Sequence, residues 1–271
     1  MSRVSLNKTQ GFTLIELLIS ISLGIVAVSA IMFFYVSTIT SSYSTLKASR
    51  LNQEMTTLMS LITNDIRRAG YGGLEGTDAS ENPFSDSITK LTVFNVSTTT
   101  TEISPSTNLT GNCIVYSYDL DGLGDFDANE QFGYRFVNNV IQVREGVNKI
   151  TTSQHCNTDS DIKWVDITDA DDITIDSFSI SLVGSVCVNT NEPDKQDNDS
   201  SGDVDDYQEY DCYLKVPGSS DYPIAVDDEI LTSEVFQVNI SIEASLTDDS
   251  SIKYQSDSVI AVRNPYVRKR T

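Results

Sequence analysis

The chain of 271 residues is poor in basic side chains, with 18 lysines and arginines against 39 aspartates and glutamates. Its formal net charge is −21. Such an acidic chain has no broad basic surface that could release counterions from phosphate groups. We therefore expect its body not to bind nucleic acid directly. The acidic excess instead suits a secreted, soluble surface or one that collects cations. The length allows one large domain or two small ones.

Cysteine and histidine patterns for zinc are missing. His155 is the only histidine, and the four cysteines include no CxxC pair, so the sequence does not favour a zinc site. An even number of cysteines predicts disulfides if the body lies outside the cytoplasm. Four cysteines allow three pairings, and their order along the chain favours Cys113 with Cys156 and Cys187 with Cys212.

Motifs for catalysis and nucleotide binding are also missing. His155 has no nucleophile motif such as G-x-S-x-G beside it. The stretch G-Y-G-G-L-E-G lacks the lysine of a phosphate-binding loop and follows a predicted helix, whereas such loops precede one. The paired carboxylates lie in Gly-rich or Ser-rich loops, with no apolar pocket nearby to raise a pKa. We therefore expect no enzymatic activity and no required cofactor.

Proline is absent before Pro83, and residues 12–36 are apolar with Glu16 as their one charge. About 20 apolar residues cross a bilayer as a helix. The basic residues Arg3 and Lys8 precede this segment, but no A-x-A-like cleavage site follows it, unlike in an ordinary secretory signal. An uncleaved signal anchor would leave Glu16 unexplained, because a carboxylate in the membrane costs about 2.5 to 3.5 kcal/mol on insertion scales.

The stretch K-T-Q-G-F-T-L-I-E-L-L, residues 8–18, resembles the class III leader and junction of type IV pilins and pseudopilins. The shared features are a short basic leader, a glycine, a phenylalanine and a glutamate at the fifth position after the junction. The resemblance implies that a membrane prepilin peptidase cuts between Gly11 and Phe12 and methylates the new amino terminus. Glu16 would then be an assembly residue, because it can neutralise the amine of a neighbouring subunit.

The helix is predicted to continue beyond the membrane until the glycines at 70, 72 and 73 end it. From residue 12 to residue 70 it would run roughly 90 Å at 1.5 Å per residue. Its second half has apolar residues at spacings of mostly three or four, which predicts a stripe that packs under a head. The stripe consists of Leu46, Leu51, Met55, Leu58, Ile62, Ile66 and Ala69.

The remaining residues predict a head of sequential antiparallel strands, so the expected fold class is α+β, with a long amino-terminal helix packed on an antiparallel β-sheet. A hairpin is expected to turn at Asn138 and Asn139. The predicted divisions are a leader (1–11), a transmembrane and assembly helix (12–40), an amphipathic extension (41–70) and an extracytoplasmic head (71–271). The predicted strands are 90–96, 113–118, 132–137, 140–144, 173–182, 235–246 and 253–262.

Further motifs resemble a narrower group, the PilW-type minor pilins, over nearly the whole chain except residues 194–211. The resemblance implies an inner-membrane protein with a periplasmic head that becomes extracellular in the pilus. It also implies a role in priming pilus polymerisation, a place at the tip, and twitching motility, adhesion or DNA uptake downstream. The motifs are N-D-I-R-R-A-G-Y-G-G (64–73), C-I-V-Y-S-Y-D (113–119), F-G-Y-R-F (132–136), W-V-D-I-T-D (164–169) and A-V-R-N (261–264).

The partners implied by this resemblance are other minor pilins, the major pilin, the prepilin peptidase, the inner-membrane assembly platform and the membrane itself before assembly. A minor pseudopilin of a type II secretion system is the alternative, because it shares the leader and the helix. A membrane-anchored, calcium-binding adhesin would explain the head but not the pattern of Gly11, Phe12 and Glu16.

Two acidic loops have the spacing of oxygen ligands in calcium-binding loops. The first lacks the glutamate expected at its twelfth position, and the second has Leu123 at a ligand position. Each loop therefore either binds calcium or forms a solvated acidic surface. The candidate ligands are Asp197, Asp199, Ser201, Asp203 and Asp205 in the first loop, and Asp119, Asp121, Asp127 and Glu130 in the second.

Overall fold

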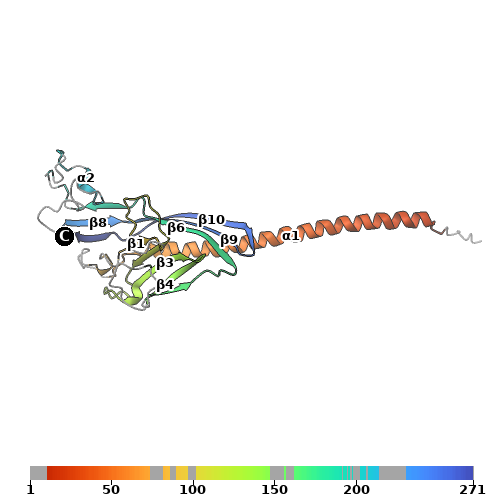
Figure 1. The fold of residues 1–271 in the computed structure, drawn as a ribbon, viewed down its shortest axis with the longest axis horizontal. Helices are drawn as coiled ribbons and strands as arrows, with labels where there is room; N and C mark the ends of the chain where they lie inside the picture. Colours follow the sequence, from red (N-terminus) through yellow and green to blue (C-terminus); the bar gives the residue numbers. More distant parts are fainter. Residues whose placement is uncertain are drawn as a thin grey trace, which may run out of the picture. The chain divides into compact units, whose positions relative to one another are not determined.

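The described residues form two compact units, which lie within Met1–Arg50 and Leu51–Thr271. The helix α1 (Leu14–Ile66) contributes residues to both units (Figure 1). A computed structural model describes residues 11–73, 82–85, 90–96, 102–146, 156, 162–190, 192–193, 195, 197, 202–205, 207–213 and 230–270.

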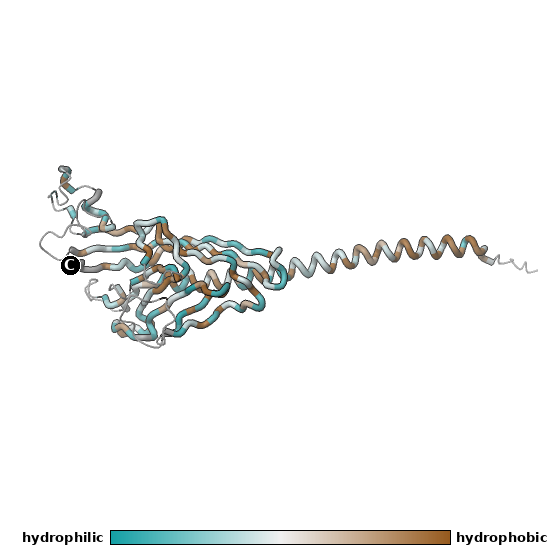
Figure 2. Tube along the Cα trace, in the orientation of Figure 1, coloured by the Kyte–Doolittle hydropathy of each residue, from teal (hydrophilic) through white to brown (hydrophobic). Residues whose placement is uncertain are grey.

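In the amino-terminal unit, α1 is apolar over most of its length, as the brown colour of its early turns shows in Figure 2. The few hydroxyl side chains bond within the helix: Ser20 Oγ donates to the carbonyl of Glu16 and Ser29 Oγ to that of Ile25, each at 2.8 Å. This internal bonding satisfies polar groups that hydrocarbon could not. Among the described residues, α1 is the one helix long and apolar enough to cross a membrane, judged by length and composition.

In the second unit, residues 51–66 of α1 bury an apolar stripe that confirms most of the predicted one. Its members recur mostly at spacings of three and four, which places them on one helical face. Leu46, the first predicted member, belongs to the amino-terminal unit and is exposed. The buried residues of this helix are Leu51, Met55, Leu58, Met59, Ile62 and Ile66.

A five-stranded antiparallel sheet, in the order β1-β2-β3-β4-β5, contributes its apolar face to the same core. Asn138 and Asn139 join β3 to β4 with φ values of 52° and 64°. Asparagine tolerates this left-handed conformation, which two-residue hairpin turns require, so the predicted hairpin is confirmed. The strands are β1 (Thr92–Phe94), β2 (Cys113–Ser117), β3 (Gln131–Val137), β4 (Val140–Gly146) and β5 (Ile162–Asp166).

A second antiparallel sheet, in the order β10-β9-β6, completes the core. In the view of Figure 1, β3 and β4 lie below residues 51–66 of α1, and β6, β9 and β10 lie above them. Alternate residues of β9 are buried, and its other residues face outward and are mainly polar. The strands are β6 (Ile173–Ser181), β9 (Gln237–Leu246) and β10 (Asp249–Ala261).

The predicted strand over 235–246 is confirmed as β9, which begins two residues later. The prediction of one sheet is wrong, because there are three among the described residues, the third in the order β11-β8-β7. Phe236 is the point of separation: its side chain is buried and lies edge-on to Tyr266, with ring centroids 5.1 Å apart. β8 ends one residue before Phe236 and β9 begins one residue after it, and the two strands belong to different sheets. The third sheet consists of β7 (Val186–Asn189), β8 (Ile230–Val235) and β11 (Tyr266–Arg270). The architecture is nevertheless the expected α+β class, a long helix packed on antiparallel sheets.

Candidate functional site

The expected processing segment begins α1 with a reciprocal pair of contacts between Thr13 and Glu16. Glu16 Oε2 accepts from the backbone N–H of Thr13 at 3.4 Å, and Thr13 Oγ1 accepts from the N–H of Glu16 at 3.3 Å. This is a capping box, which satisfies amide groups that the first helical turn leaves without partners. The T-x-x-E pattern that signals it is visible in the sequence, but sequence reasoning did not use it. Glu16 thus has a local partner as well as the intersubunit role expected of it.

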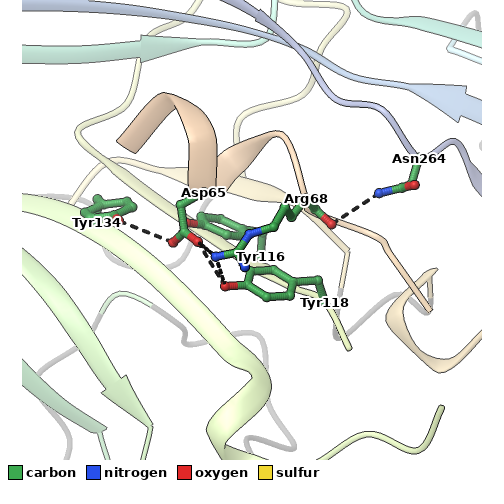
Figure 3. A network of polar contacts seen from close by, with 6 residues as sticks. All are labelled: Asp65, Arg68, Tyr116, Tyr118, Tyr134 and Asn264. Carbon is green, nitrogen blue, oxygen red and sulfur yellow. Dashed lines mark hydrogen bonds and ion pairs between the residues drawn. The ribbon is translucent and has the colours of Figure 1, made fainter. Parts of the chain in front are cut away.

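A polar network in the second unit ties the end of α1 to the five-stranded sheet (Figure 3). Asp65 lies at its centre, one residue before α1 ends. Its Oδ2 accepts from the hydroxyls of Tyr116 at 2.6 Å and Tyr134 at 3.3 Å. Its Oδ1 accepts from the hydroxyl of Tyr118 at 2.9 Å and from Arg68 Nη2 at 2.6 Å.

The β-strands place the three tyrosines on one face of the sheet. Tyr116 and Tyr118 are two residues apart on or just after β2, and alternate strand residues point the same way. Tyr134 lies on the neighbouring strand β3. Burial raises the pKa of Tyr116, Tyr118 and Tyr134, and the negative charge of Asp65 raises each further. The tyrosines are therefore neutral donors to a carboxylate at physiological pH.

Arg68 brings a positive charge to the same carboxylate. Its Nη2 also contacts the Tyr118 hydroxyl at 2.5 Å, and its guanidinium carbon lies 4.3 Å from the centre of the Tyr118 ring. The ion pair with Asp65 is local, because Arg68 lies three residues later, in the turn after α1. Tyr118 in turn stacks on Phe132 with centroids 4.1 Å apart. The network thus combines an ion pair, hydrogen bonds of tyrosine hydroxyls and contacts between aromatic rings.

The turn after α1 is closed by the carboxyl-terminal part of the chain. Asn264 Nδ2 donates to the carbonyls of Arg68 at 3.2 Å and Ala69 at 3.1 Å (Figure 3). Gly70 has φ +76°, and a Cβ there would come within 3.0 Å of the Tyr266 ring. Glycine is therefore needed for both conformation and space. The motifs that contain Asp65, Tyr116, Tyr134 and Asn264 in the sequence thus meet at one place.

The second predicted calcium loop gathers three of its four candidate ligands. Carboxylate oxygens of Asp119, Asp121 and Glu130 lie within 4.8 Å of one another. Asp119 is buried and accepts from the N–H groups of Gly122 at 2.5 Å and Gly124 at 3.0 Å. Glu130 accepts from the N–H groups of Leu120 at 2.9 Å and Asp127 at 2.8 Å. The group does not include the side chain of Asp127.

The same residues shape the loop without a metal. Two backbone N–H groups donate to each of the buried carboxylates, Asp119 and Glu130. Each carboxylate oxygen has a second lone pair that a hard cation could use. The residues present therefore fit a cation with oxygen ligands, and they also fit a loop ordered by its own amides.

The first predicted calcium loop is described only in part. Asp199 and Ser201 lie outside the described residues. Asp197 Oδ2 accepts from the N–H of Gly202 at 2.9 Å, and Asp203 is exposed. Asp205 lies in a group with Glu192 and Glu209, neither of which was a predicted ligand.

Two disulfides hold the head, between Cys113 and Cys156 and between Cys187 and Cys212. These are the pairs that chain order favours. His155, beside Cys156, lies outside the described residues. Arg135 Nη1 donates to the Cys156 carbonyl at 2.9 Å, and its guanidinium lies 4.4 Å from the centre of a Trp164 ring. Burial lowers the pKa of Arg135 to about 10, against the opposing charge of Asp166.

Comparisons with known families match both parts of the chain. Residues 6–32 match the prokaryotic N-terminal methylation motif, and residues 44–262 match prepilin peptidase-dependent protein B. No curated protein and no solved structure matches the chain. The first match covers Gly11, Phe12 and Glu16. The second covers both disulfides and Asp65 with the three tyrosines and Arg68, but not Asn264. With a prepilin-type leader, one long apolar anchoring helix and a β-rich head, the chain belongs to the prepilin peptidase-dependent protein B family and is a minor pilin of the type IV pilin-like class.

Proposed function

We propose that the chain is a PilW-type minor pilin that joins other minor pilins to prime polymerisation of a type IV pilus and stays at its tip. The observation that carries the proposal is the methylation motif on an apolar helix, followed by a matched head over residues 44–262. Such a chain is suited to structural assembly rather than to catalysis. Twitching motility, adhesion or DNA uptake would then follow from the pilus that it primes.

Processing and assembly would use the start of α1. A prepilin peptidase would cut between Gly11 and Phe12, leave the new amine on Phe12 and methylate it. Glu16 accepts weakly from Thr13, at 3.4 Å, so its carboxylate can exchange this contact for the amine of a neighbouring subunit. Pairing offsets the cost of both charges in hydrocarbon. The inner membrane would hold the subunit, with its head in the periplasm, until the assembly platform moves it into the fibre with the major pilin.

The head would behave as one rigid unit during assembly. Residues 51–66 of α1 supply part of its core, and the network of Asp65 fixes the helix end to the sheet. Two disulfides add covalent ties suited to an oxidising compartment. Such a head keeps its outward surfaces in fixed relation to one another, which recognition of other subunits requires.

Deletion of the gene in the source organism tests the proposal, with surface pili and secretion of exoproteins scored in the same strain. Loss of pili with intact secretion is the expected result, and expression of the full chain should restore them. Loss of secretion with intact pili would contradict the proposal and identify a minor pseudopilin of a type II secretion system. Normal pili and normal secretion would also contradict it.

A further inference from the structure

Arg144 is a buried cation on the outer face of the five-stranded sheet. Along β4, Ile141 and Val143 pack into the main core. Because successive side chains of a strand point to opposite faces, Arg144 lies on the face away from that core. Only 5% of its surface is nevertheless exposed. Arginine is almost never buried to this degree unless an opposite charge pairs with it.

The guanidinium of Arg144 makes one hydrogen bond to the described part of the chain. Its Nη2 donates to Oε1 of Gln131, a buried residue on the neighbouring strand β3, at 2.7 Å. Nε and Nη1 are also buried, and among the described residues neither has an acceptor within hydrogen-bonding distance. The ion pairs found between described side chains do not include Arg144. Its charge is therefore uncompensated there.

Arg135, on the same face of the sheet, shows the usual treatment of a buried arginine. Its Nε donates to Oε1 of Gln142 at 2.7 Å, and its Nη1 donates to the Cys156 carbonyl at 2.9 Å. The charge of Asp166 also opposes the lowering of the Arg135 pKa by burial. Burial lowers the pKa of Arg144 to about 10 as well, and no charge of the described residues opposes it. The need for a counter-charge is thus specific to Arg144.

The surroundings of Arg144 leave two separate costs inside the head. A buried N–H group without an acceptor has lost its hydration and gained no hydrogen bond in return. A buried charge without a counter-charge costs more, because the protein interior solvates it poorly. A water molecule would accept from Nε or Nη1 but would leave the charge uncompensated. A bound anion removes both costs, because it forms charge-assisted hydrogen bonds with the guanidinium.

The site limits both the charge and the size of such an anion. One guanidinium is balanced by one negative charge, so a monovalent anion leaves the site neutral. A doubly charged phosphate would bring excess negative charge into the interior of a chain that already has −21. Because Arg144 is so well covered, a carboxylate side chain of another protein would have to displace the residues around it. A small monovalent ion of the halide class fits both limits.

We propose that Arg144 binds a small monovalent anion, with chloride as the simplest case, through Nε and Nη1. Nη2 stays on Gln131, which holds the guanidinium beside β3. The bound ion neutralises Arg144 and so stabilises the outer face of the five-stranded sheet. This proposal does not depend on the proposed function, because it uses neither the processing segment nor a partner subunit.

Trp164 provides a reporter for the site. It is the one tryptophan of the chain, and it lies directly across from Arg144 in the ladder between β4 and β5. Side chains paired in this way share a face and have Cβ atoms about 4.5 to 5.5 Å apart. Bromide quenches the fluorescence of a nearby indole through its heavy atom. The full chain in detergent would be titrated with sodium bromide, which replaces sodium gluconate at constant ionic strength because gluconate is too large for the site.

The expected result in the parent is a saturable quenching of Trp164 on top of the linear collisional part, reversed by added chloride. Arg144→Met should lower the saturable part about ten-fold, because the charged donors are lost. Lys163→Met is the matched control: it removes the same charge beside Trp164, but from an exposed side chain paired with Glu145. The saturable part should persist in this control.

Melting temperatures give an independent measurement. Replacement of sodium gluconate by sodium chloride at equal ionic strength should raise the melting temperature of the parent and of Lys163→Met, but not that of Arg144→Met. In gluconate, Arg144→Met should melt no lower than the parent, because an apolar side chain of similar length replaces an uncompensated buried charge. If Arg144→Met does not fold, Arg144→Gln takes its place in both measurements, since it also removes the charge.

Four outcomes would overturn the proposal. These are purely linear quenching in the parent, saturable quenching of equal size without Arg144, saturable quenching that chloride does not reverse, and equal melting of the parent in chloride and in gluconate. The first and the last would mean that Nε and Nη1 take no anion. The other two would place the bound bromide elsewhere near Trp164.

Discussion

The hydroxyl of Tyr116 donates a hydrogen bond of 2.6 Å to the carboxylate of Asp65, across 51 residues of sequence. The tyrosine is fully buried, and the aspartate lies where α1 ends. Because Tyr118, Tyr134 and Arg68 reach the same carboxylate, the polar attachment of the helix end to the sheet depends on one side chain.

Asp65→Ala should therefore destabilise the head strongly, because it leaves the hydroxyls of three tyrosines without their acceptor. We expect the free energy of unfolding to fall by about 3 to 5 kcal/mol. Thermal unfolding of the full chain in detergent would measure the loss, at about 2 to 4 °C per kcal/mol for a unit of this size. Asp257→Ala, at an exposed position of β10, is the control and should change little. Equal losses in the two variants would contradict the central role of Asp65.

The buried tyrosines predict sensitivity to alkaline pH. Their pKa values are raised above 10.0 by burial and by Asp65, so above pH 10 the unfolded chain loses protons that the folded chain keeps. Their contribution to stability is then complete below about pH 10 and declines as pH rises through the folded pKa values. Melting temperature measured from pH 8 to pH 11 should fall at the alkaline end.

Two variants separate this effect from other alkaline damage. The Tyr116→Phe variant should have a lower melting temperature than the parent at pH 8, because Asp65 loses a hydrogen-bond donor. Its melting temperature should also fall less steeply above pH 10. Tyr254→Phe, a partly exposed residue on β10, should follow the parent. A fall of the same steepness in the parent and in Tyr116→Phe would refute the assignment to this network.

Gly11→Val should block processing, because a branched side chain before the cut obstructs the approach of the peptidase to the backbone. Unprocessed precursor should accumulate in the membrane, whereas the parent should begin at a methylated Phe12. Amino-terminal sequencing and mass spectrometry of the purified chain provide the measurement. A mature start after residue 36 in the parent would show that the leader assignment is wrong.

Glu16→Ala should separate processing from assembly. The variant retains Gly11 and Phe12, so cleavage should persist, but the amine of a neighbouring subunit loses its counter-charge in hydrocarbon. Incorporation with partner pilins should then weaken, measured as the share of processed subunit recovered in sheared pili. Thr13→Ala is the matched control, since it removes the other half of the capping box and leaves the charge. Equal assembly by Glu16→Ala and the parent would exclude the charge pair.

Calcium at millimolar concentration should raise the melting temperature of the head, since an extracellular site can bind at about 0.1 to 1 mM. Magnesium should act less, because it gives up its water reluctantly. Asp121→Asn should remove part of the rise while its side chain can still accept from the N–H of Leu123. Asp125→Asn, an exposed neighbour in the same loop outside the group of three, is the control. Identical melting with calcium and with chelator would leave both loops as solvated acidic surfaces.

The sequence predicted those features that have a local cause. Spacing of apolar residues located the buried stripe of α1 from Leu51 onward, and the Asn138–Asn139 pair located a hairpin. Chain order favoured the two cysteine pairs. The third sheet was missed because its strands are short. On β7 the exposed residues are valines, so the strand lacks the usual alternation of buried apolar and exposed polar residues.

The contacts of the candidate site could be foreseen only in part. Alternation along β2 places Tyr116 and Tyr118 on one side, but nothing local shows that Asp65 lies opposite them. Asn264 reaches Arg68 from 196 residues away, and only packing of the whole head brings them together. The acidic loops illustrate the same limit. Ligand spacing predicted Asp119, Asp121, Asp127 and Glu130, whereas the structure groups only the other three and leaves out the side chain of Asp127.

The position of Asn264 has a consequence for the time course of folding. The helix that it closes is synthesised before it, and Asn264 follows Arg68 by 196 residues. At about 5 to 20 residues per second, roughly 10 to 40 s separate the two events. During that interval the apolar stripe of α1 is not yet covered, because β9 and Tyr266 have not been synthesised. The head therefore completes its fold only after residues 264 to 266 have been made, and a chain that ends at residue 262 should not acquire native resistance to protease.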